Sequence, residues 1–386
     1  MMIEENKNIS DLSSPLGVRG LSLIIAGGGT GGHIFPAIAI ANAIKKLAPQ
    51  SQILFVGANG KMEMEKVPQA GYEIKGLDIA GFNRSSLIKN IGLPFKLVKS
   101  FFQVAAIFKK FKPSAVIGVG GYSSFPVLRY AQNQGIPTFI HESNSFAGRS
   151  NIMLGKKATG IFTASGGMGK FFPVEKIIIS GNPVRQSISN SNVTKEAALK
   201  HFGLSADKKV VLSIGGSLGA KSINEAIDKD IDLFEQNNLQ LIWQTGTGYK
   251  AKAVERAKGK TNVFVSDFIT QMEFAYAAAD MVISRSGAMA IAELCVLKKP
   301  VLFVPYPFAA EDHQTVNAKT LVNKQAAQMI KDGDALQMLV PSVIAMSKDN
   351  STQNELKENI SKLAITNADV RIAEVILERL KSLKSK

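Results

Sequence analysis

The stretch from Ile24 to Ile44 reads IIAGGGTGGHIFPAIAIANAI and contains no charged side chain. Its uncharged length is sufficient for a helix that crosses a bilayer. The glycine cluster at 27–32 and Pro36 disfavour one continuous helix, however, and favour a strand, a turn and a helix in succession. We therefore interpret this stretch as a strand that ends in a glycine-rich turn and enters a helix, and we expect a soluble chain.

The composition limits the class of protein. The chain has 386 residues, 45% of them hydrophobic, and its single cysteine is Cys295. One cysteine excludes an internal disulfide framework and fits a reducing compartment. The length predicts two domains. The segment 1–19 is acidic and polar and lacks the basic start and apolar core of a secretory signal, so we expect a loose tail there.

Short apolar runs alternate with helical stretches along the whole chain. The runs lie at 21–26, 52–57, 114–120, 136–141 and 176–180, and again at 209–216, 239–244, 262–268, 280–284 and 300–305. Apolar strands separated by helices are typical of parallel sheets that are covered on both faces. The pattern predicts an α/β fold with two doubly wound, Rossmann-like domains, 20–184 and 185–365, which face each other across a cleft. We expect the last helix, 366–386, to return to the first domain.

The glycine loops allow more than one interpretation. Gly27, Gly29 and Gly32 match the dinucleotide pattern G-x-G-x-x-G, but the second strand ends at 55–60 without an acidic residue for a ribose, which disfavours NAD. The loop 215–222 resembles a phosphate-binding Walker loop, with Ala220 in place of a glycine. Its backbone N–H groups can hold a diphosphate at a helix N-terminus, or the glycines only make a tight turn.

Polar residues follow several predicted strands of the first half. His33 in TGGH can accept a proton from a hydroxyl group near neutral pH, or it can simply hydrogen-bond to the backbone. Tyr122, Glu142 and Asn144 follow two further strands. Because the carboxyl ends of parallel strands meet at one edge of the sheet, these groups together indicate a binding site better than any one of them alone.

The second half has its own polar strand ends. Glu293 lies in a predicted helix, where its carboxylate can accept hydrogen bonds from a ribose diol or lie on a solvated face. Gln314 and Asn317 are spaced to share a helix face, and their amides suit sugar hydroxyls. The four histidines lack the spacing of metal ligands, and we expect Cys295 to be a core residue. The sequence therefore predicts no metal site.

The net charge of +15 is unevenly distributed, because no acidic residue occurs between Asp78 and Glu142. Such a basic block attracts nucleic acid or an anionic membrane surface. Apolar residues at helical spacing over 95–111 favour a helix that covers a sheet. The preceding Ile88 and Ile91 suit insertion among anionic lipid headgroups. Since the aromatic residues here are not interleaved with arginine as on a base-stacking surface, we favour a membrane and no nucleic acid as partner.

Seven motifs occur in a specific order. They are GGGTGGHIFPAIAIA (27–41), GVGGYSSFP (118–126), HESN (141–144), GNPVR (181–185), GGSLGA (215–220), SRSGAMAIAE (284–293) and EDHQTVNA (311–318). As an ordered set over about residues 20–380, the chain closely resembles the bacterial peptidoglycan glycosyltransferases that make lipid II. The resemblance implies a GT-B fold and inverting transfer from UDP-N-acetylglucosamine to the 4-hydroxyl of the muramoyl sugar of lipid I. It implies no metal or other cofactor, and a peripheral position on the cytoplasmic face of the inner membrane.

The resemblance also implies roles for individual residues. His33 is our candidate base, and Tyr122 and Asn144 fall with it on the acceptor side. The positions implied for the donor are Thr30, Gly31, Gly32, Asn144, Arg185, Ser217, Ile269, Ala288, Glu293 and Gln314. Among these, Ser217 belongs to the diphosphate loop, the backbone of Ile269 contacts uracil, and Glu293 holds the ribose. Gln314 contacts the N-acetylglucosamine.

The sequence departs from this family at two places, and other functions stay open. Ala290 stands where many relatives have a hydroxyl residue, and Ser143 stands where an amide is common. One alternative is a UDP-N-acetylglucosamine 2-epimerase, which would leave the basic apolar block unexplained. Others are a different glycolipid-forming transferase of the same fold and a peripheral membrane protein without enzymatic activity.

Overall fold

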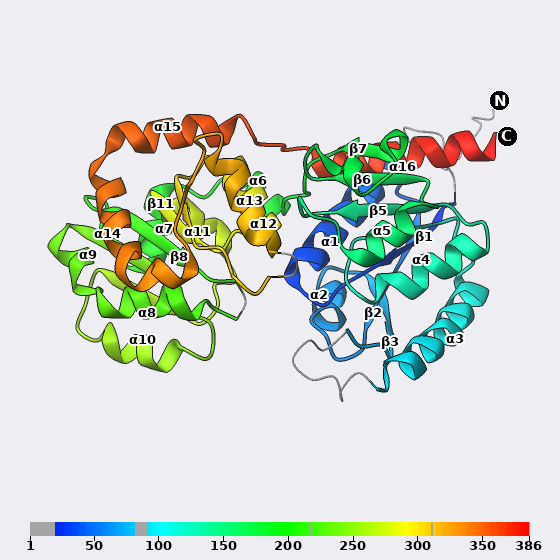
Figure 1. The fold of residues 1–386 in the computed structure, drawn as a ribbon, viewed down its shortest axis with the longest axis horizontal. Coiled ribbons are helices and arrows are strands. Elements are labelled where there is room, and N and C mark those ends of the chain that lie inside the picture. Colours follow the sequence, from blue (N-terminus) through cyan, green and yellow to red (C-terminus); the bar gives the residue numbers. More distant parts are fainter. Residues whose placement is uncertain (1–19, 82–90, 217, 310–311, 386) are drawn as a thin grey trace, which may run out of the picture. The chain divides into compact units, whose positions relative to one another are not determined.

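The computed structural model describes residues 20–81, 91–216, 218–309 and 312–385, which form two compact units (Figure 1). Unit 1 contains the described residues up to Glu142, then Ala147–Ser180 and the residues from Asn367 onward. Unit 2 contains Ser143–Phe146 and Gly181–Thr366.

The units divide at slightly different residues from those predicted, since 143–146 and 181–184 group with unit 2. Side-chain amides account for the first difference. Asn182 Nδ2 donates a hydrogen bond to the carbonyl oxygen of Ser143 at 3.0 Å, and the N–H of Ser145 donates to Asn317 Oδ1 at 3.3 Å. These bonds hold the segment 143–146 against unit 2.

Unit 1 is built on a seven-stranded parallel sheet with the order β3-β2-β1-β4-β5-β6-β7. The chain turns from one side of the sheet to the other between β1 and β4, which is the switch point where ligands of such sheets bind. The strands are β1 (Ser22–Ala26), β2 (Gln52–Ala58), β3 (Glu73–Leu77), β4 (Ala115–Gly118), β5 (Thr138–Glu142), β6 (Gly160–Thr163) and β7 (Ile177–Ile179).

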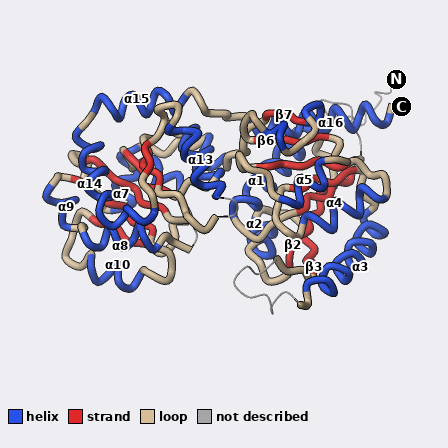
Figure 2. The backbone as a smooth tube through the Cα atoms, viewed as in Figure 1, coloured by secondary structure: helices blue, strands red, loops and turns tan. Residues whose placement is uncertain are grey.

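Helices cover both faces of this sheet (Figures 1 and 2). On one face, Ile40 of α1 and Ile376 of α16 lie in the same buried cluster; on the other, Val104 of α3, Leu128 of α4 and Leu154 of α5 do. The helices are α1 (Gly31–Leu47), α2 (Glu63–Gln69), α3 (Leu93–Phe111), α4 (Ser124–Asn133), α5 (Arg149–Gly155) and α16 (Ala368–Lys384).

Unit 2 repeats the plan with a six-stranded parallel sheet in the order β10-β9-β8-β11-β12-β13 and a switch point between β8 and β11. Its strands are β8 (Lys209–Ile214), β9 (Leu239–Gln244), β10 (Val263–Ser266), β11 (Met281–Ser284), β12 (Val301–Phe303) and β13 (Gln328–Met329). Its helices are α6 (Gln186–Ser189), α7 (Lys195–Phe202), α8 (Lys221–Lys229), α9 (Asp232–Gln236), α10 (Lys250–Arg256), α11 (Met272–Ala278), α12 (Ala288–Val296), α13 (His313–Val322), α14 (Ala335–Lys348) and α15 (Asn350–Ser361).

The predicted fold class, an α/β fold with two parallel Rossmann-like sheets, is confirmed. Every apolar run predicted to be a strand contains one, with ends that shift by a few residues. Three strands were missed for physical reasons. The strand β3 is a half-exposed edge that carries charged residues, β6 reads GIFT and has only two large apolar residues, and β13 has only two residues.

The helix α3 differs from its prediction. Val104 and Phe108 are buried as expected of a helix that covers the sheet, but Phe95, Val98 and Phe102 of the same apolar run are 78%, 57% and 73% exposed. The helix packs against α4 and β3 along only one side, so these three side chains have no surface to cover. The segment 82–90, which includes Ile88, lies outside the described residues. Among the described helices, none is long and apolar enough to span a bilayer.

Candidate active site

In each unit, two loops follow the strands at the switch point. In unit 1 these are the loop 27–30 after β1 and the loop 119–122 after β4. In unit 2 they are 215–220 after β8 and 285–287 after β11. Since the strands are parallel, both loops of a unit lie at the carboxyl edge of its sheet, where the sequence predicted the functional residues.

The two loops of unit 1 meet backbone to backbone. The N–H of Gly28 donates to the carbonyl oxygen of Gly120 at 3.3 Å. A Cβ atom at Gly121 would lie 2.4 Å from the carbonyl oxygen of Gly28, and Gly121 has a φ of +84°. Only glycine permits this approach, which explains the glycine content of both motifs.

His33 is oriented by this loop. Its Nδ1 lies 3.0 Å from the carbonyl oxygen of Gly28 and 3.4 Å from Thr30 Oγ1. A carbonyl oxygen only accepts hydrogen bonds, so Nδ1 carries the hydrogen and the neutral ring has its lone pair on Nε2. A Cβ atom at Gly120 would lie 2.8 Å from Nε2, so a glycine is needed beside the ring. The backbone hydrogen bond considered from the sequence is thus present, and it presents Nε2 as a proton acceptor.

The other predicted residues of unit 1 lie around the same loop. Thr30 is exposed and occupies the N-cap position of α1 without a capping hydrogen bond from its side chain, and Gly31 and Gly32 begin the first turn, which contains no acidic residue. Tyr122 is partly buried, and its Cε1 would lie 3.8 Å from a Cβ atom at Gly29. Burial raises the pKa of Tyr122, so its phenol stays protonated at neutral pH.

The motif HESN divides between the two units. Glu142 ends β5, is buried, and accepts hydrogen bonds from the N–H of Gly148 at 3.1 Å and from Asn151 Nδ2 at 2.8 Å. This carboxylate therefore stabilises the turn before α5. Asn144 lies in the segment 143–146, which groups with unit 2, and its side chain is partly exposed.

In unit 2, Glu293 of α12 lies in a hydrogen-bonded cluster. Its Oε1 accepts from Arg185 Nη2 at 2.8 Å and from Arg185 Nε at 3.1 Å, and its Oε2 accepts from Tyr276 Oη at 2.9 Å. The side chain of Glu293 is only 8% exposed, so the interpretation as a solvated helix face is wrong. Burial raises the pKa of Tyr276 well above its usual value, and the charge of Glu293 adds to this effect, so the tyrosine remains a hydrogen-bond donor.

This cluster limits how Glu293 can hold a ligand. A carboxylate has about four lone-pair positions, and Arg185 and Tyr276 already use three of them. A diol that binds both carboxylate oxygens therefore requires Arg185 to leave Oε1. The ion pair and the predicted ligand contact compete for the same atom.

Gln244, at the end of β9, connects two other predicted parts of the site. Its Nε2 donates to the carbonyl oxygen of Gly216 at 3.1 Å, and its Oε1 accepts the N–H of Ile269 at 3.1 Å. The backbone N–H of Ile269 is thus engaged within the protein, so its carbonyl oxygen is the group for the predicted base contact. Ser217 lies outside the described residues.

The remaining predicted residues surround α12 and α13. Gln314 Oε1 accepts the N–H of Tyr306 at 3.0 Å, which directs its NH₂ group away from that bond. Asn317 is buried; its Oδ1 accepts the N–H of Ser145, and its Nδ2 donates to the carbonyl oxygen of Ser286. Ala288 begins α12, and its carbonyl oxygen lies 3.4 Å from Asn182 Nδ2.

Sequence reasoning missed Arg285, although it is the charged residue of the SRSG turn. Its Nη1 bonds Asp332 Oδ1 at 2.5 Å and the carbonyl oxygen of Val304 at 2.8 Å, and its Nη2 donates to Ser222 Oγ at 3.1 Å. It thereby joins the loop after β11 to the start of α8. Its position directly after a strand was the available signal. Tyr276 had no such signal, because it lies within an apolar helical stretch.

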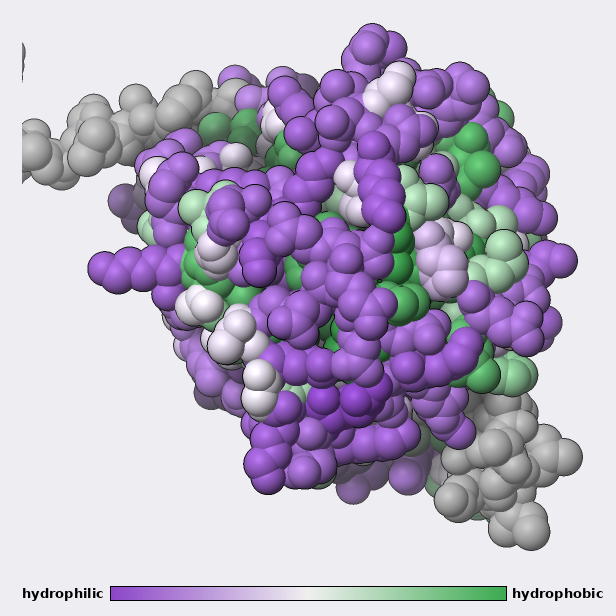
Figure 3. Space-filling model, turned by 90° about the vertical axis from the view of Figure 1, so that its left-hand side faces the viewer, coloured by the Kyte–Doolittle hydropathy of each residue, from purple (hydrophilic) through white to green (hydrophobic). Residues whose placement is uncertain are grey.

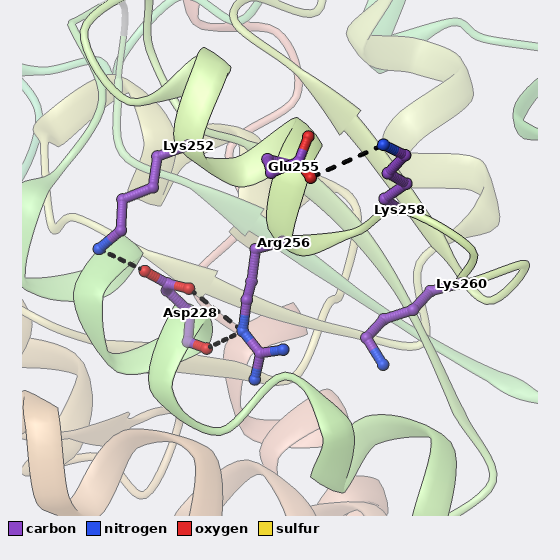
Figure 4. A pocket seen from close by; sticks show the side chains of 6 residues that line it. All are labelled: Asp228, Lys252, Glu255, Arg256, Lys258 and Lys260. Carbon is purple, nitrogen blue, oxygen red and sulfur yellow. Dashed lines mark hydrogen bonds and ion pairs between the residues drawn. The ribbon is translucent and has the colours of Figure 1, made fainter.

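A hollow in unit 2 lies elsewhere (Figure 4). It is lined by Asp228, Lys252, Glu255, Arg256, Lys258 and Lys260. These residues come from α8, α10 and the segment that leads into β10, mostly at the amino edge of the sheet, and Asp228 pairs with Lys252 and Arg256. Basic residues outnumber acidic ones in this hollow, and it lies away from the loops at the switch point. Among the described residues, no three His, Cys, Asp or Glu side chains gather as metal ligands.

Both units match models of known protein families. Residues 23–163 match the model of the glycosyltransferase family 28 N-terminal domain, and 210–375 match that of its C-terminal domain. A UDP-N-acetylglucosamine–N-acetylmuramyl-(pentapeptide) pyrophosphoryl-undecaprenol N-acetylglucosamine transferase of Phocaeicola vulgatus is 50% identical over 93% of this chain and 96% of its own length. The protein of the same name from Parabacteroides distasonis is 50% identical over 94% and 99%.

Solved structures show the same architecture. The crystal structure of Acinetobacter baumannii MurG has a TM-score of 0.72 and 28% identity, and the match covers 93% of this chain and 99% of that one. A UDP-N-acetylglucosamine 2-epimerase structure has a TM-score of 0.66 at 15% identity, which shows a shared fold alone.

Cys295 of α12 provides a test of how well this part of the site is packed. It is buried, as predicted, and burial raises its thiol pKa to about 12. Since the thiolate is the reactive form, we expect Ellman's reagent at pH 8 to label the native chain at least about a hundredfold more slowly than the guanidinium-unfolded chain. The slow rate should persist to pH 9. Fast labelling of the native chain would show that α12 is not packed as described.

Proposed function

The chain belongs to the family of UDP-N-acetylglucosamine–N-acetylmuramyl-(pentapeptide) pyrophosphoryl-undecaprenol N-acetylglucosamine transferases, and we propose that it carries out that transfer itself. It would move N-acetylglucosamine from UDP-N-acetylglucosamine to the 4-hydroxyl of the muramoyl sugar of lipid I, giving lipid II. The observation that carries the proposal is the 50% sequence identity to one of these transferases over nearly the whole of both chains.

Unit 2 would hold the donor. Departure of UDP places negative charge on its diphosphate, and the N-terminus of α8 and Arg185 can stabilise that charge as it develops. Arg185 would leave Glu293 Oε1 for the diphosphate, which makes that oxygen available to the ribose. Tyr276, bonded to the other oxygen at 2.9 Å, would keep the carboxylate in place during the exchange.

Unit 1 would activate the acceptor. His33 Nε2 would take the proton of the 4-hydroxyl as its oxygen attacks the anomeric carbon from the face opposite UDP, so the configuration inverts. The hydrogen bond of Nδ1 to Gly28 orients the ring for this step, and the carbonyl dipole stabilises the imidazolium that forms.

The other implied contacts follow from the motif resemblance. We assign the carbonyl of Ile269 to uracil, the NH₂ group of Gln314 to the N-acetylglucosamine, and the start of α12 at Ala288 and the loop residue Ser217 to the UDP moiety. Thr30, Gly31, Gly32 and Asn144 would contact the reacting sugars, and Tyr122 the acceptor.

The exposed face of α3 supports a membrane-bound acceptor. Ile91, Phe95, Val98 and Phe102 are each more than half exposed, and Lys96 lies exposed among them. Apolar side chains beside lysines suit the headgroup layer of an anionic bilayer. By contrast, hydrophilic residues predominate on the face shown in Figure 3, the side on the left in Figure 1. We infer peripheral binding at the cytoplasmic face of the inner membrane.

A transfer assay tests the reaction. Purified protein with radiolabelled UDP-N-acetylglucosamine and a lipid I analogue should place the label in the lipid product, with release of UDP. Conversion of the donor to UDP-N-acetylmannosamine would instead identify an epimerase. Absence of both reactions, together with tight vesicle binding, would favour a protein without enzymatic activity.

Two variants should separate the roles of the units. We expect His33→Ala to lower kcat by about 10²–10⁴-fold, the usual contribution of a general base, with a nearly unchanged KM for the donor. Glu293→Gln should mainly raise the donor KM, because it weakens the ribose contact. Steady-state kinetics with both substrates measures the difference. An unchanged kcat in His33→Ala would exclude it as the base.

Vesicle sedimentation tests whether the exposed apolar side chains of α3 bind a membrane. Phe95→Ser/Phe102→Ser should weaken binding to anionic vesicles by about tenfold or more, because each exposed aromatic side chain contributes apolar area. Added salt should weaken binding of the unmodified chain as well. The matched control is Leu336→Ser/Met338→Ser, at two exposed apolar positions of α14, which should bind normally. Equal binding by both double variants would contradict the assignment to α3.

A further inference from the structure

Glu63 is a buried carboxylate beneath the glycine loop of unit 1. It is the first residue of α2 and is 1% exposed. Its Oε2 accepts the N–H of Gly29 at 2.8 Å, and its Oε1 accepts the N–H of Ala58 at 3.0 Å. In the described part of the chain, no lysine or arginine forms an ion pair with it. Both hydrogen bonds that the described residues donate to this carboxylate come from backbone N–H groups.

Glycines enclose this side chain. A Cβ atom at Gly28 would lie 2.3 Å from Glu63 Cδ, and a Cβ atom at Gly57 would lie 2.5 Å from its Cγ. Larger residues at either position would displace the carboxylate. The glycines of both strand ends therefore form a site that a glutamate side chain fills.

The N–H that Glu63 engages belongs to the same peptide group as the carbonyl that orients His33. The peptide between Gly28 and Gly29 accepts from His33 Nδ1 through its oxygen at 3.0 Å and donates to Glu63 Oε2 through its N–H at 2.8 Å. A peptide group is planar and conjugated, so fixing the N–H also fixes the direction of the C=O. A charged acceptor on the N–H polarises the group and increases the negative charge on its oxygen.

This arrangement also withdraws one backbone N–H of the loop from the binding of an anion. A phosphate bound there would need the backbone N–H groups of the loop. The N–H of Gly29 is already donated to a carboxylate, and the buried negative charge repels a second anion. A neutral hydroxyl group meets no such repulsion.

We propose that Glu63 is a positioning residue that acts on His33 through the Gly28–Gly29 peptide, as a carboxylate–peptide–imidazole relay. The carboxylate touches no substrate. It holds the carbonyl oxygen on which the Nδ1–H of His33 depends, and it stabilises the imidazolium when Nε2 takes the acceptor proton. This role rests on the proposed function of His33 as the base.

Glu63→Gln tests the relay with minimal change of volume. An amide keeps one acceptor oxygen but places an NH₂ group against one of the two backbone N–H donors, so the Gly28–Gly29 peptide loses its fixed direction. We expect kcat to fall by about 10–100-fold, by analogy with the loss of a hydrogen-bonded group that orients a metal-ligating imidazole. The donor KM should stay within about twofold, since the proposed donor contacts lie in unit 2. The exposed neighbour Glu65, changed to Gln, is the matched control and should retain full kcat.

An NMR measurement distinguishes the relay from a merely structural role. The protein is labelled with glycine that carries both a ¹³C carbonyl and ¹⁵N, and an HNCO spectrum correlates each amide with the carbonyl of the preceding residue. Only glycines that follow another glycine then give a signal, among them Gly29. Its amide proton, in a short bond to a carboxylate, should resonate far downfield and move upfield in Glu63→Gln. If Glu63→Gln does not fold, Glu63→Asp, which keeps the charge, takes its place. We expect its loss of kcat to be smaller than that of Glu63→Gln.

Two results would overturn the relay. One is a normal kcat in folded Glu63→Gln. The other is a loss of activity that parallels only the loss of folded protein, with the Gly29 signal unmoved in the folded fraction. If the unmodified chain transfers no sugar at all, the proposed function fails, whereas the Gly29 signal still decides whether Glu63 orients the loop.

Discussion

In each unit, the close approach of backbone to backbone between loops at the carboxyl edge of the sheet is the constraint on which the candidate site residues depend. In unit 1 the loop after β1 contacts the loop after β4, and Gly121 is packed against the carbonyl of Gly28. In unit 2 a Cβ atom at Gly219 would lie 1.9 Å from the carbonyl oxygen of Thr245. Parallel sheets bring such loops to one edge, and glycine lets them touch. Side chains that bond to these loops, such as His33, are then held by peptide groups that cannot move independently of the neighbouring loop.

Electrostatics gives the two loops different chemistry. Beneath the loop of unit 1 lies the carboxylate of Glu63, which consumes a loop N–H and disfavours anions. The loop of unit 2 leads into α8, whose first turn contains no acidic residue, and Arg185 lies in the same unit. A helix N-terminus and a guanidinium favour a diphosphate. Two loops with similar glycine patterns are thus suited to a neutral hydroxyl and to a charged leaving group, respectively.

Unit 2 also shows how Glu293, the residue proposed to hold the ribose, can be kept in place before a ligand binds. Glu293 is nearly buried, and an unpaired carboxylate there would be costly. Arg185 and Tyr276 satisfy it through three hydrogen bonds. If Arg185 moved to a diphosphate, the ribose hydroxyls would replace its hydrogen bonds to Glu293, so the carboxylate would stay hydrogen-bonded although its ion pair is lost. The tyrosine, whose pKa is raised by burial, remains a donor in either arrangement.

The sequence by itself determined the fold class, the two sheets and the loops that carry the site, because apolar strands and glycine turns are local signals. It also identified His33 and Glu293 through their motifs. Only the tertiary structure decided which atoms they use: the Nδ1 bond to Gly28, and the ion pair that occupies one oxygen of Glu293. It alone revealed Glu63 and Tyr276, which come from other helices, and it showed the hydrogen bond between Asn317 and Ser145 and the exposure of Phe95 and Phe102. Periodicity gives the face on which a side chain lies, whereas its partners depend on elements distant in the chain.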